Sequence, residues 1–175
     1  MTNKKININR APVMTLWAAI VAKRLGYDEE TALTLGKAVA GLNAQSKGRQ
    51  LGIYEEKTEQ EKKQEEKKEK PIELEFIELL GRGVSVVKTA HGLRATIKGE
   101  TIQSDGVRSY LEQKFGAAYA EARSAMEYLA KAFPPAELES KAYHLYEKFR
   151  PEIPEGKKGW GAKGDLDLDY IRSLA

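Results

Sequence analysis

Apolar residues recur every three or four positions over two stretches near the start of the chain, and this spacing predicts two helices. Pro12 suits the first turn of the first helix, whose apolar stripe consists of Val13, Leu16, Trp17, Ile20, Val21 and Leu25. Gly26 ends this helix, and Asp28 is placed to cap a second one that runs to about Gln45, with Gly48 beyond its end. The first third of the chain is therefore predicted to be a helical hairpin.

Two glycines interrupt the second predicted helix. Gly36 and Gly41 each cost roughly 1 kcal/mol relative to alanine in a helix interior. A close approach of another helix would explain this cost. The alternative is that the small surface receives a ligand or a partner.

The pattern changes beyond the hairpin. Residues 55–70 contain no apolar residue and cannot join a core, so the segment up to Pro71 is predicted to be a charged linker, either coil or solvated helix. Alternation at the start of 72–80 and branched residues in 84–88 and 93–97 then predict a small antiparallel sheet of two or three strands. The sequence Gly81-Arg82-Gly83 is predicted to be a turn between strands.

Helical spacing returns from Ser104. One short stripe reaches Phe115 and a longer one runs from Tyr119 to Phe133, where Pro134-Pro135 breaks it. A third helix ends before Pro151. In the tail, a glycine- and lysine-rich loop around Trp160 either packs the last helix or grips a partner, and Asp165 to Arg172 is predicted to form a short terminal helix.

These elements predict an α+β fold that is mainly α, in three parts. Residues 1–54 form the basic helical hairpin, residues 55–71 the charged linker, and residues 72–175 an α+β domain with a small antiparallel sheet and three to four helices. A two-helix hairpin of this size buries too little surface to be stable alone. It must therefore dock on the C-terminal unit or on another copy of itself.

Composition removes most enzyme chemistries. The 175 residues include no cysteine and only two histidines, neither with a neighbouring ligand at metal spacing, so we expect no metal and no cofactor. The sequence lacks a phosphate-binding loop and a nucleophile elbow. No run of about 18 apolar residues could span a membrane, and a cytoplasmic location is the default. An enzyme with a shallow site near His91 or Trp160 is the least favoured hypothesis.

The charge distribution is more informative than the net charge of +3. Residues 1–54 hold eight Lys or Arg against three acidic residues, an asymmetry compatible with nucleic-acid binding, although lysine-rich surfaces also serve solubility. In this basic region the two helices and their glycine turn resemble a helix-turn-helix. The candidate phosphate contacts are Arg10, Lys23, Arg24, Lys37, Lys47 and Arg49.

One feature of the same region opposes direct reading of bases. The first turn of the second helix carries Glu29 and Glu30 after Asp28, and these carboxylates would face the negatively charged DNA. Only Thr31, Thr34 and Lys37 remain to contact base edges. Any DNA contact is therefore predicted to involve the backbone.

Three segments resemble an uncharacterised bacterial protein family: Ile8–Val13, Leu33–Asn43 and Gly159–Ala162. The resemblance implies an organisation, with two family-like ends around a variable charged spacer, and no functional residue. The leading hypothesis is a small cytoplasmic, non-enzymatic protein that is DNA-associated or regulatory. The alternative is a protein–protein interaction or oligomerisation scaffold that uses the Gly36/Gly41 helix and binds no nucleic acid.

Overall fold

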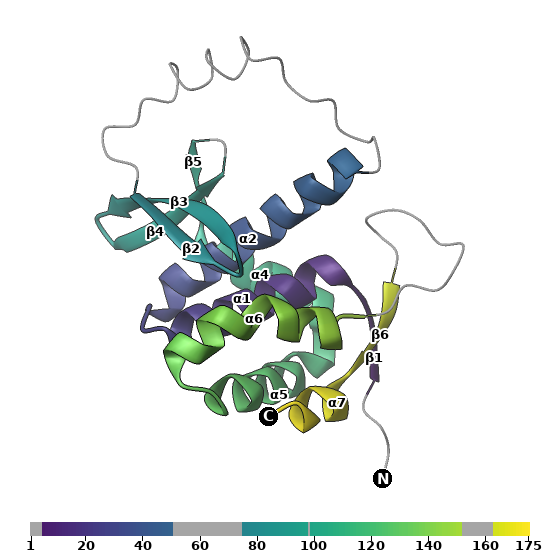
Figure 1. Ribbon diagram of the computed structural model, residues 1–175. Coiled ribbons are helices and arrows are strands. Elements are labelled where there is room, and N and C mark those ends of the chain that lie inside the picture. Colours follow the sequence, from purple (N-terminus) through teal and green to yellow (C-terminus); the bar gives the residue numbers. More distant parts are fainter. Residues whose placement is uncertain (1–4, 51–74, 98, 152–162) are drawn as a thin grey trace.

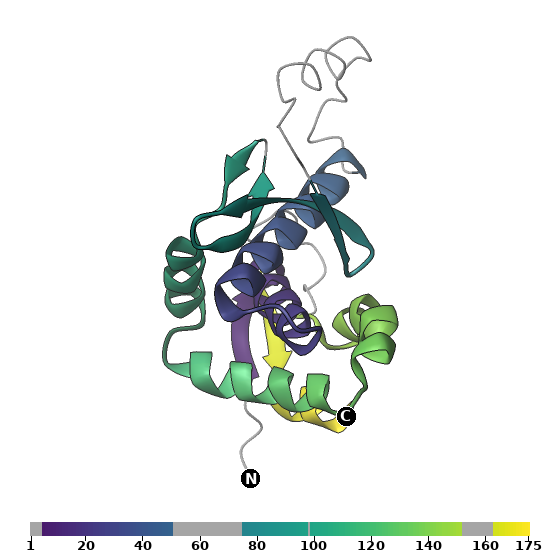
Figure 2. The ribbon, with the colours of Figure 1, turned by 90° about the vertical axis from the view of Figure 1, so that its left-hand side faces the viewer.

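The computed structural model describes residues 5–50, 75–97, 99–151 and 163–175, and for residues 44–50 it describes the backbone alone. A small antiparallel sheet lies on one side of a long helix, α2, and the other helices lie on its opposite side around α1 (Figures 1 and 2). The predicted α+β class with mainly α content is confirmed.

Helix α1 lies at the centre of the helical layer. All residues from Pro12 to Ala22 are buried, so the helix is enclosed on every side and not along one stripe. The apolar stripe seen in the sequence is thus only part of its buried surface, because the small residues between the stripe positions are enclosed too. The helices are α1 (Arg10–Arg24), α2 (Glu29–Gln50), α4 (Ser104–Phe115), α5 (Tyr119–Lys131), α6 (Pro135–Phe149) and α7 (Leu168–Ser173), with a 3-10 turn at Gly116–Ala118.

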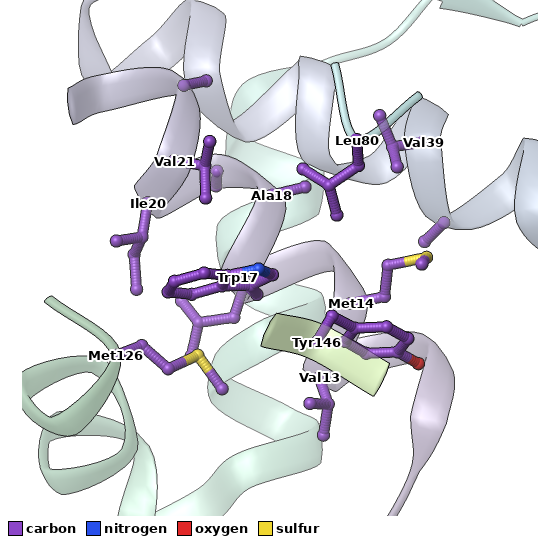
Figure 3. Close-up of a cluster of buried hydrophobic side chains, with 14 of the residues drawn as sticks. Val13, Met14, Trp17, Ala18, Ile20, Val21, Val39, Leu80, Met126 and Tyr146 are labelled. Atoms are coloured by element: carbon purple, nitrogen blue, oxygen red, sulfur yellow. The ribbon is translucent and has the colours of Figure 1, made fainter. Parts of the chain in front are cut away.

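Trp17 joins α1 to α6. It is fully buried, its Nε1 donates a hydrogen bond to the carbonyl oxygen of Ala142 at 2.9 Å, and its ring meets Phe149 edge to face at 5.2 Å between centroids. Tyr146 and Met126 lie around the same ring (Figure 3). Residues before and after the predicted linker therefore share one hydrophobic core, and the hairpin docks on the C-terminal elements.

The larger sheet has four strands in the order β2-β3-β4-β5, one more than the longest predicted sheet. The two-residue strand β5 is too short to leave a hydrophobic pattern in the sequence. The strands are antiparallel, with bounds β2 (Glu75–Leu79), β3 (Arg82–Thr89), β4 (Gly92–Ile97) and β5 (Glu100–Thr101).

The turn between β2 and β3 consists of Leu80 and Gly81, one residue earlier than predicted. Both have positive φ, 50° and 74°, which is uncommon for leucine. Leu80 is nevertheless buried, and its side chain lies between Ala18 and Val39 in the helical core (Figure 3). Burial of this apolar side chain compensates for the backbone conformation and anchors the hairpin tip to the helices.

A second, two-stranded sheet pairs the two ends of the chain. Strand β1 (Lys5–Asn9) runs antiparallel to β6 (Lys163–Asp167), with Ile6 opposite Leu166. The prediction of a helix from Asp165 is therefore wrong for its first three residues. The alternation of Asp and Leu there is a strand pattern that buries Gly164 and Leu166 on one face, and α7 begins only at Leu168.

Two predictions fall outside the described residues. The charged linker 55–71 is one, and the loop around Trp160 is the other. Among the helices that the structure describes, none is long and apolar enough to cross a membrane.

Candidate functional site

The turn of the helix-turn-helix-like unit has the cap that the sequence predicts. Gly26 adopts a φ of 112°, and the Thr31 backbone N–H donates to the Asp28 carboxylate at 3.3 Å. The Thr31 hydroxyl lies 2.6 Å from the other carboxylate oxygen, and this hydrogen bond lowers the pKa of Asp28. Asp28 is therefore the N-cap of α2.

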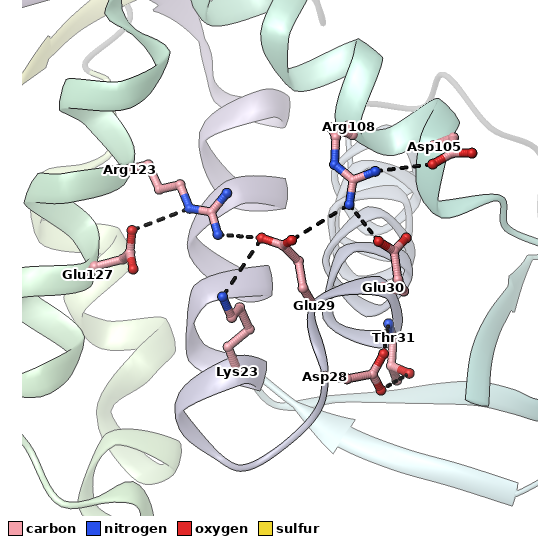
Figure 4. Close-up of polar contacts among 9 residues, drawn as sticks. All are labelled: Lys23, Asp28, Glu29, Glu30, Thr31, Asp105, Arg108, Arg123 and Glu127. Atoms are coloured by element: carbon pink, nitrogen blue, oxygen red, sulfur yellow. Dashed lines mark hydrogen bonds and ion pairs between the residues drawn. The ribbon is translucent and has the colours of Figure 1, made fainter. Parts of the chain in front are cut away.

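The acidic first turn of α2 is paired with cations from three other helices. Arg123 of α5 donates to Glu29, and Lys23 of α1 lies 3.7 Å from the same carboxylate. Arg108 of α4 donates to Glu30 at 2.6 Å and lies 3.7 Å from Glu29 (Figure 4). We call these five residues the α2 clamp.

Hydrogen bonding in the clamp favours the charged carboxylates. The Arg123 hydrogen bond lowers the pKa of Glu29, and hydrogen bonds from Ser104 and then Arg108 lower the pKa of Glu30. A recognition helix needs its first turn free to enter a groove. Here Arg108 of α4 and Arg123 of α5 pair with that end of α2, so the acidic residues that opposed DNA binding join α2 to these helices.

The side chains predicted to contact bases are all engaged within the chain. The Thr31 hydroxyl lies 2.7 Å from the Leu93 carbonyl oxygen, and the Thr34 hydroxyl accepts a hydrogen bond from the Ala95 N–H at 3.0 Å. Lys37 lies over the Tyr110 ring, 3.9 Å from its centroid, and burial lowers the pKa of Lys37.

Two of the candidate phosphate contacts lie at opposite ends of α1. Arg10 Nε donates to the Pro151 carbonyl oxygen at 2.8 Å, and an Arg24 guanidinium nitrogen donates to the Phe133 carbonyl oxygen at 3.1 Å. Fourteen residues separate them along the helix, about 21 Å at 1.5 Å per residue. Both guanidinium groups therefore tie α1 to the ends of neighbouring helices.

The other candidates are equally dispersed. Lys23 belongs to the α2 clamp and Lys37 to the contact with α4. Lys47 and Arg49 lie in the last turns of α2, where the structure describes only the backbone. The four candidates whose side chains the structure describes each contact a different part of the chain: Arg10 contacts Pro151, Lys23 contacts Glu29, Arg24 contacts Phe133 and Lys37 contacts Tyr110.

Gly36 and Gly41 also have internal roles. A Cβ at Gly36 would lie 2.3 Å from the Thr15 carbonyl oxygen, so the predicted close approach of another helix is confirmed there, with α1 as that helix. At Gly41 the nearest atom is Ile97 Cδ1 at 3.4 Å, which belongs to the sheet. The helix face on which the scaffold hypothesis relied is therefore covered by this chain itself.

The two edges of the four-stranded sheet differ. On the β5 side, β4 is longer than β5, and its unpaired part forms hydrogen bonds with other groups. Thr31 and Thr34 of α2 bond its backbone, and the Ile102 N–H donates to the Ala95 carbonyl oxygen at 2.9 Å. On the opposite side, β2 has no strand partner among the described residues. Its Phe76 is 69% exposed, the largest value among the exposed large apolar side chains.

Phe76 was not among the residues predicted from the sequence, although the strand pattern contains a signal for it. Ile77 and Leu79 face the helices, so the period of two in a strand requires Phe76 to face the other way. An aromatic residue at such a position is unexplained by packing. The open edge, defined as residues Glu75 to Leu79, is the candidate site that the geometry identifies.

No other site of comparable definition is found in the described residues. They contain no group of three His, Asp or Glu residues able to hold a metal ion. The hollow between α1, α2 and α5, bordered by Ile20, Tyr119 and Arg123, is too small for a ligand much larger than a water molecule. Comparisons with protein-family models, curated proteins and solved structures gave no match.

Proposed function

We propose that this chain is a cytoplasmic, non-enzymatic interaction protein that binds an extended segment of a protein partner along the open edge of β2. The observation that carries the proposal is the asymmetry of the sheet. On one side, Thr34 of α2 and Ile102 cover the part of β4 that the two-residue strand β5 leaves unpaired, whereas the five-residue strand β2 has an outer edge that is unpaired in the described residues and exposes Phe76. Addition of a strand to such an edge is a common mode of peptide recognition.

The backbone geometry of β2 suits this role. In a hairpin closed by a two-residue turn, the flanking residues form a hydrogen-bonded pair, and bonded and non-bonded pairs then alternate along the ladder. Leu79 and Arg82 flank the turn, so Phe76 and Glu78 occupy non-bonded positions opposite β3. Their N–H and C=O groups point away from β3 and are available to a fifth strand added beside β2.

The edge is also held in a fixed position. Leu80 anchors the end of β2 between α1 and α2, and Val84 and Val86 of the paired strand are buried. A preformed strand needs little further ordering when it binds, which reduces the entropic cost of association. Long open edges favour aggregation, and natural proteins protect them with charges such as those of Glu75 and Glu78.

The variant Glu78→Pro tests the proposal. Proline removes one outward N–H, a change that edge strands tolerate, so the fold should persist with an unchanged circular dichroism spectrum. Glu78→Ala is the matched control, because it removes the carboxylate and keeps the N–H. Because both variants lack the carboxylate, weaker capture of lysate proteins by Glu78→Pro than by Glu78→Ala would report the loss of the N–H and support edge recognition. Equal retention by both variants would contradict it.

DNA association through Arg10, Lys23, Arg24, Lys37, Lys47 and Arg49 is the competing proposal. Its signature is micromolar or tighter binding to a mixed-sequence duplex that weakens steeply with salt, measured by fluorescence anisotropy. Such binding, lost when Lys23, Arg24, Lys47 and Arg49 are all changed to Ala and retained in Glu78→Pro, would replace the interaction proposal.

A further inference from the structure

The charges on the open edge indicate which kind of segment it accepts. Glu75 and Glu78 are both exposed, and neither forms an ion pair with any described residue. Building on the proposed edge recognition, we infer that the partner segment is basic, with two Lys or Arg residues that flank two apolar residues.

The spacing follows from the strand period. Positions 75 and 78 are three residues apart, so the two carboxylates lie on opposite faces of the sheet. A strand added beside β2 therefore places one basic residue on each face, also three positions apart. The two residues between them lie opposite Phe76 and Ile77, where apolar side chains gain cross-strand contacts. The pattern reads the same in both directions and fits parallel or antiparallel addition.

Charge complementarity favours such a segment over a second copy of the chain. Two β2 strands would bring four carboxylates together without a cation, and edge charges of one sign oppose self-pairing. The full sequence contains no pair of Lys or Arg residues separated by two apolar ones; its only pair at that spacing, Lys67 and Lys70, encloses Lys68 and Glu69. The acidic edge also repels a nucleic-acid backbone.

The test uses a fluorescein-labelled peptide, Thr-Thr-Lys-Val-Val-Lys-Thr-Thr, and the intact protein. Its control, Thr-Thr-Lys-Lys-Val-Val-Thr-Thr, has the same composition and charge with the wrong spacing. Fluorescence anisotropy should show at least about tenfold tighter binding of the first peptide. The double variant Glu75→Lys with Glu78→Lys should reverse the preference and bind Thr-Thr-Glu-Val-Val-Glu-Thr-Thr. Equal binding of the two lysine peptides would overturn the inference.

The outcomes distinguish failure of the basic segment from failure of edge recognition itself. If no lysine peptide binds while partner capture still depends on the Glu78 N–H, the partner class is wrong and edge recognition stands. If Glu78→Pro changes neither peptide binding nor capture, both fail. A dimer in sedimentation velocity that Glu78→Pro abolishes would assign the edge to a second copy and overturn the basic segment.

Discussion

The α1–α2 hairpin and the open edge of β2 lie close together in the fold and differ in every property that matters for binding. The hairpin contains eleven consecutive buried residues in α1, and its polar side chains pair with α4, α5 and β4. The β2 edge has an exposed aromatic ring, two exposed carboxylates and outward backbone groups. The hairpin thus has the more regular hydrophobic pattern in the sequence and the smaller exposed surface in the structure. Both follow from close packing, which requires apolar residues at regular positions.

The largest effect is expected where the hairpin is packed most tightly. Gly36→Ala places a Cβ against the Thr15 backbone, which cannot move without shifting α1, so we expect a loss of about 1–3 kcal/mol or more in the free energy of unfolding. Gly41→Ala is the matched control, because its Cβ meets only the end of Ile97 and alanine favours the helix. Chemical denaturation measures both. Equal losses would contradict the tight crossing.

The closed edge of the sheet provides the next test. Thr34→Val keeps the size of the side chain and removes the acceptor for the buried Ala95 N–H, so it should cost about 1–3 kcal/mol. Thr34→Ser keeps the hydroxyl and should cost less. Amide hydrogen exchange at Ala95 should accelerate in Thr34→Val alone. If Ala95 stays protected in that variant, the hydroxyl does not close the edge.

The α2 clamp predicts a dependence on acid. The folded-state pKa values of Glu29 and Glu30 are lowered, so their contribution is complete above the ordinary glutamate value of 4.5 and is lost as the pH falls through the folded values. Because both side chains are about two-fifths exposed, each pair contributes at most about 1 kcal/mol. The difference in Tm between wild type and Glu29→Gln should therefore shrink between pH 6 and pH 3. A constant difference would place the effect elsewhere.

Much of the fold could be predicted because it depends on local signals. Gly26, Asp28 and Pro135 mark helix ends through backbone conformation and capping, and the structure confirms each of them. The strands β1 and β6 were not predicted because each has only five residues. They form a sheet only with each other, and paired residues such as Asn7 and Asp165 are 158 positions apart in the sequence. A short strand of this kind carries too little local information to be distinguished from a coil or a helix start.

The site was harder to predict, for a physical reason. A charge in the sequence does not reveal its partner, so Arg108 and Arg123 could not be matched to Glu30 and Glu29 before α4 and α5 were placed. From the sequence alone, these two carboxylates were expected to repel DNA. In the structure they pair with arginines and join helices. The exposure of Phe76 could have been predicted from the alternation of the strand, because Phe76 and Ile77 face opposite sides of the sheet. That prediction requires knowing which side faces the core.

The smallest effect on stability is expected at the open edge itself. Phe76→Thr replaces an exposed ring with a residue that favours strands, so the free energy of unfolding should change by no more than about 0.5 kcal/mol. The same change removes the apolar contact on the outer face and should weaken binding of the lysine peptide severalfold. Tyr128→Thr, at another exposed aromatic residue, is the control and should leave peptide binding unchanged. A large loss of stability in Phe76→Thr would show that the ring packs within the chain and is not free to contact a partner.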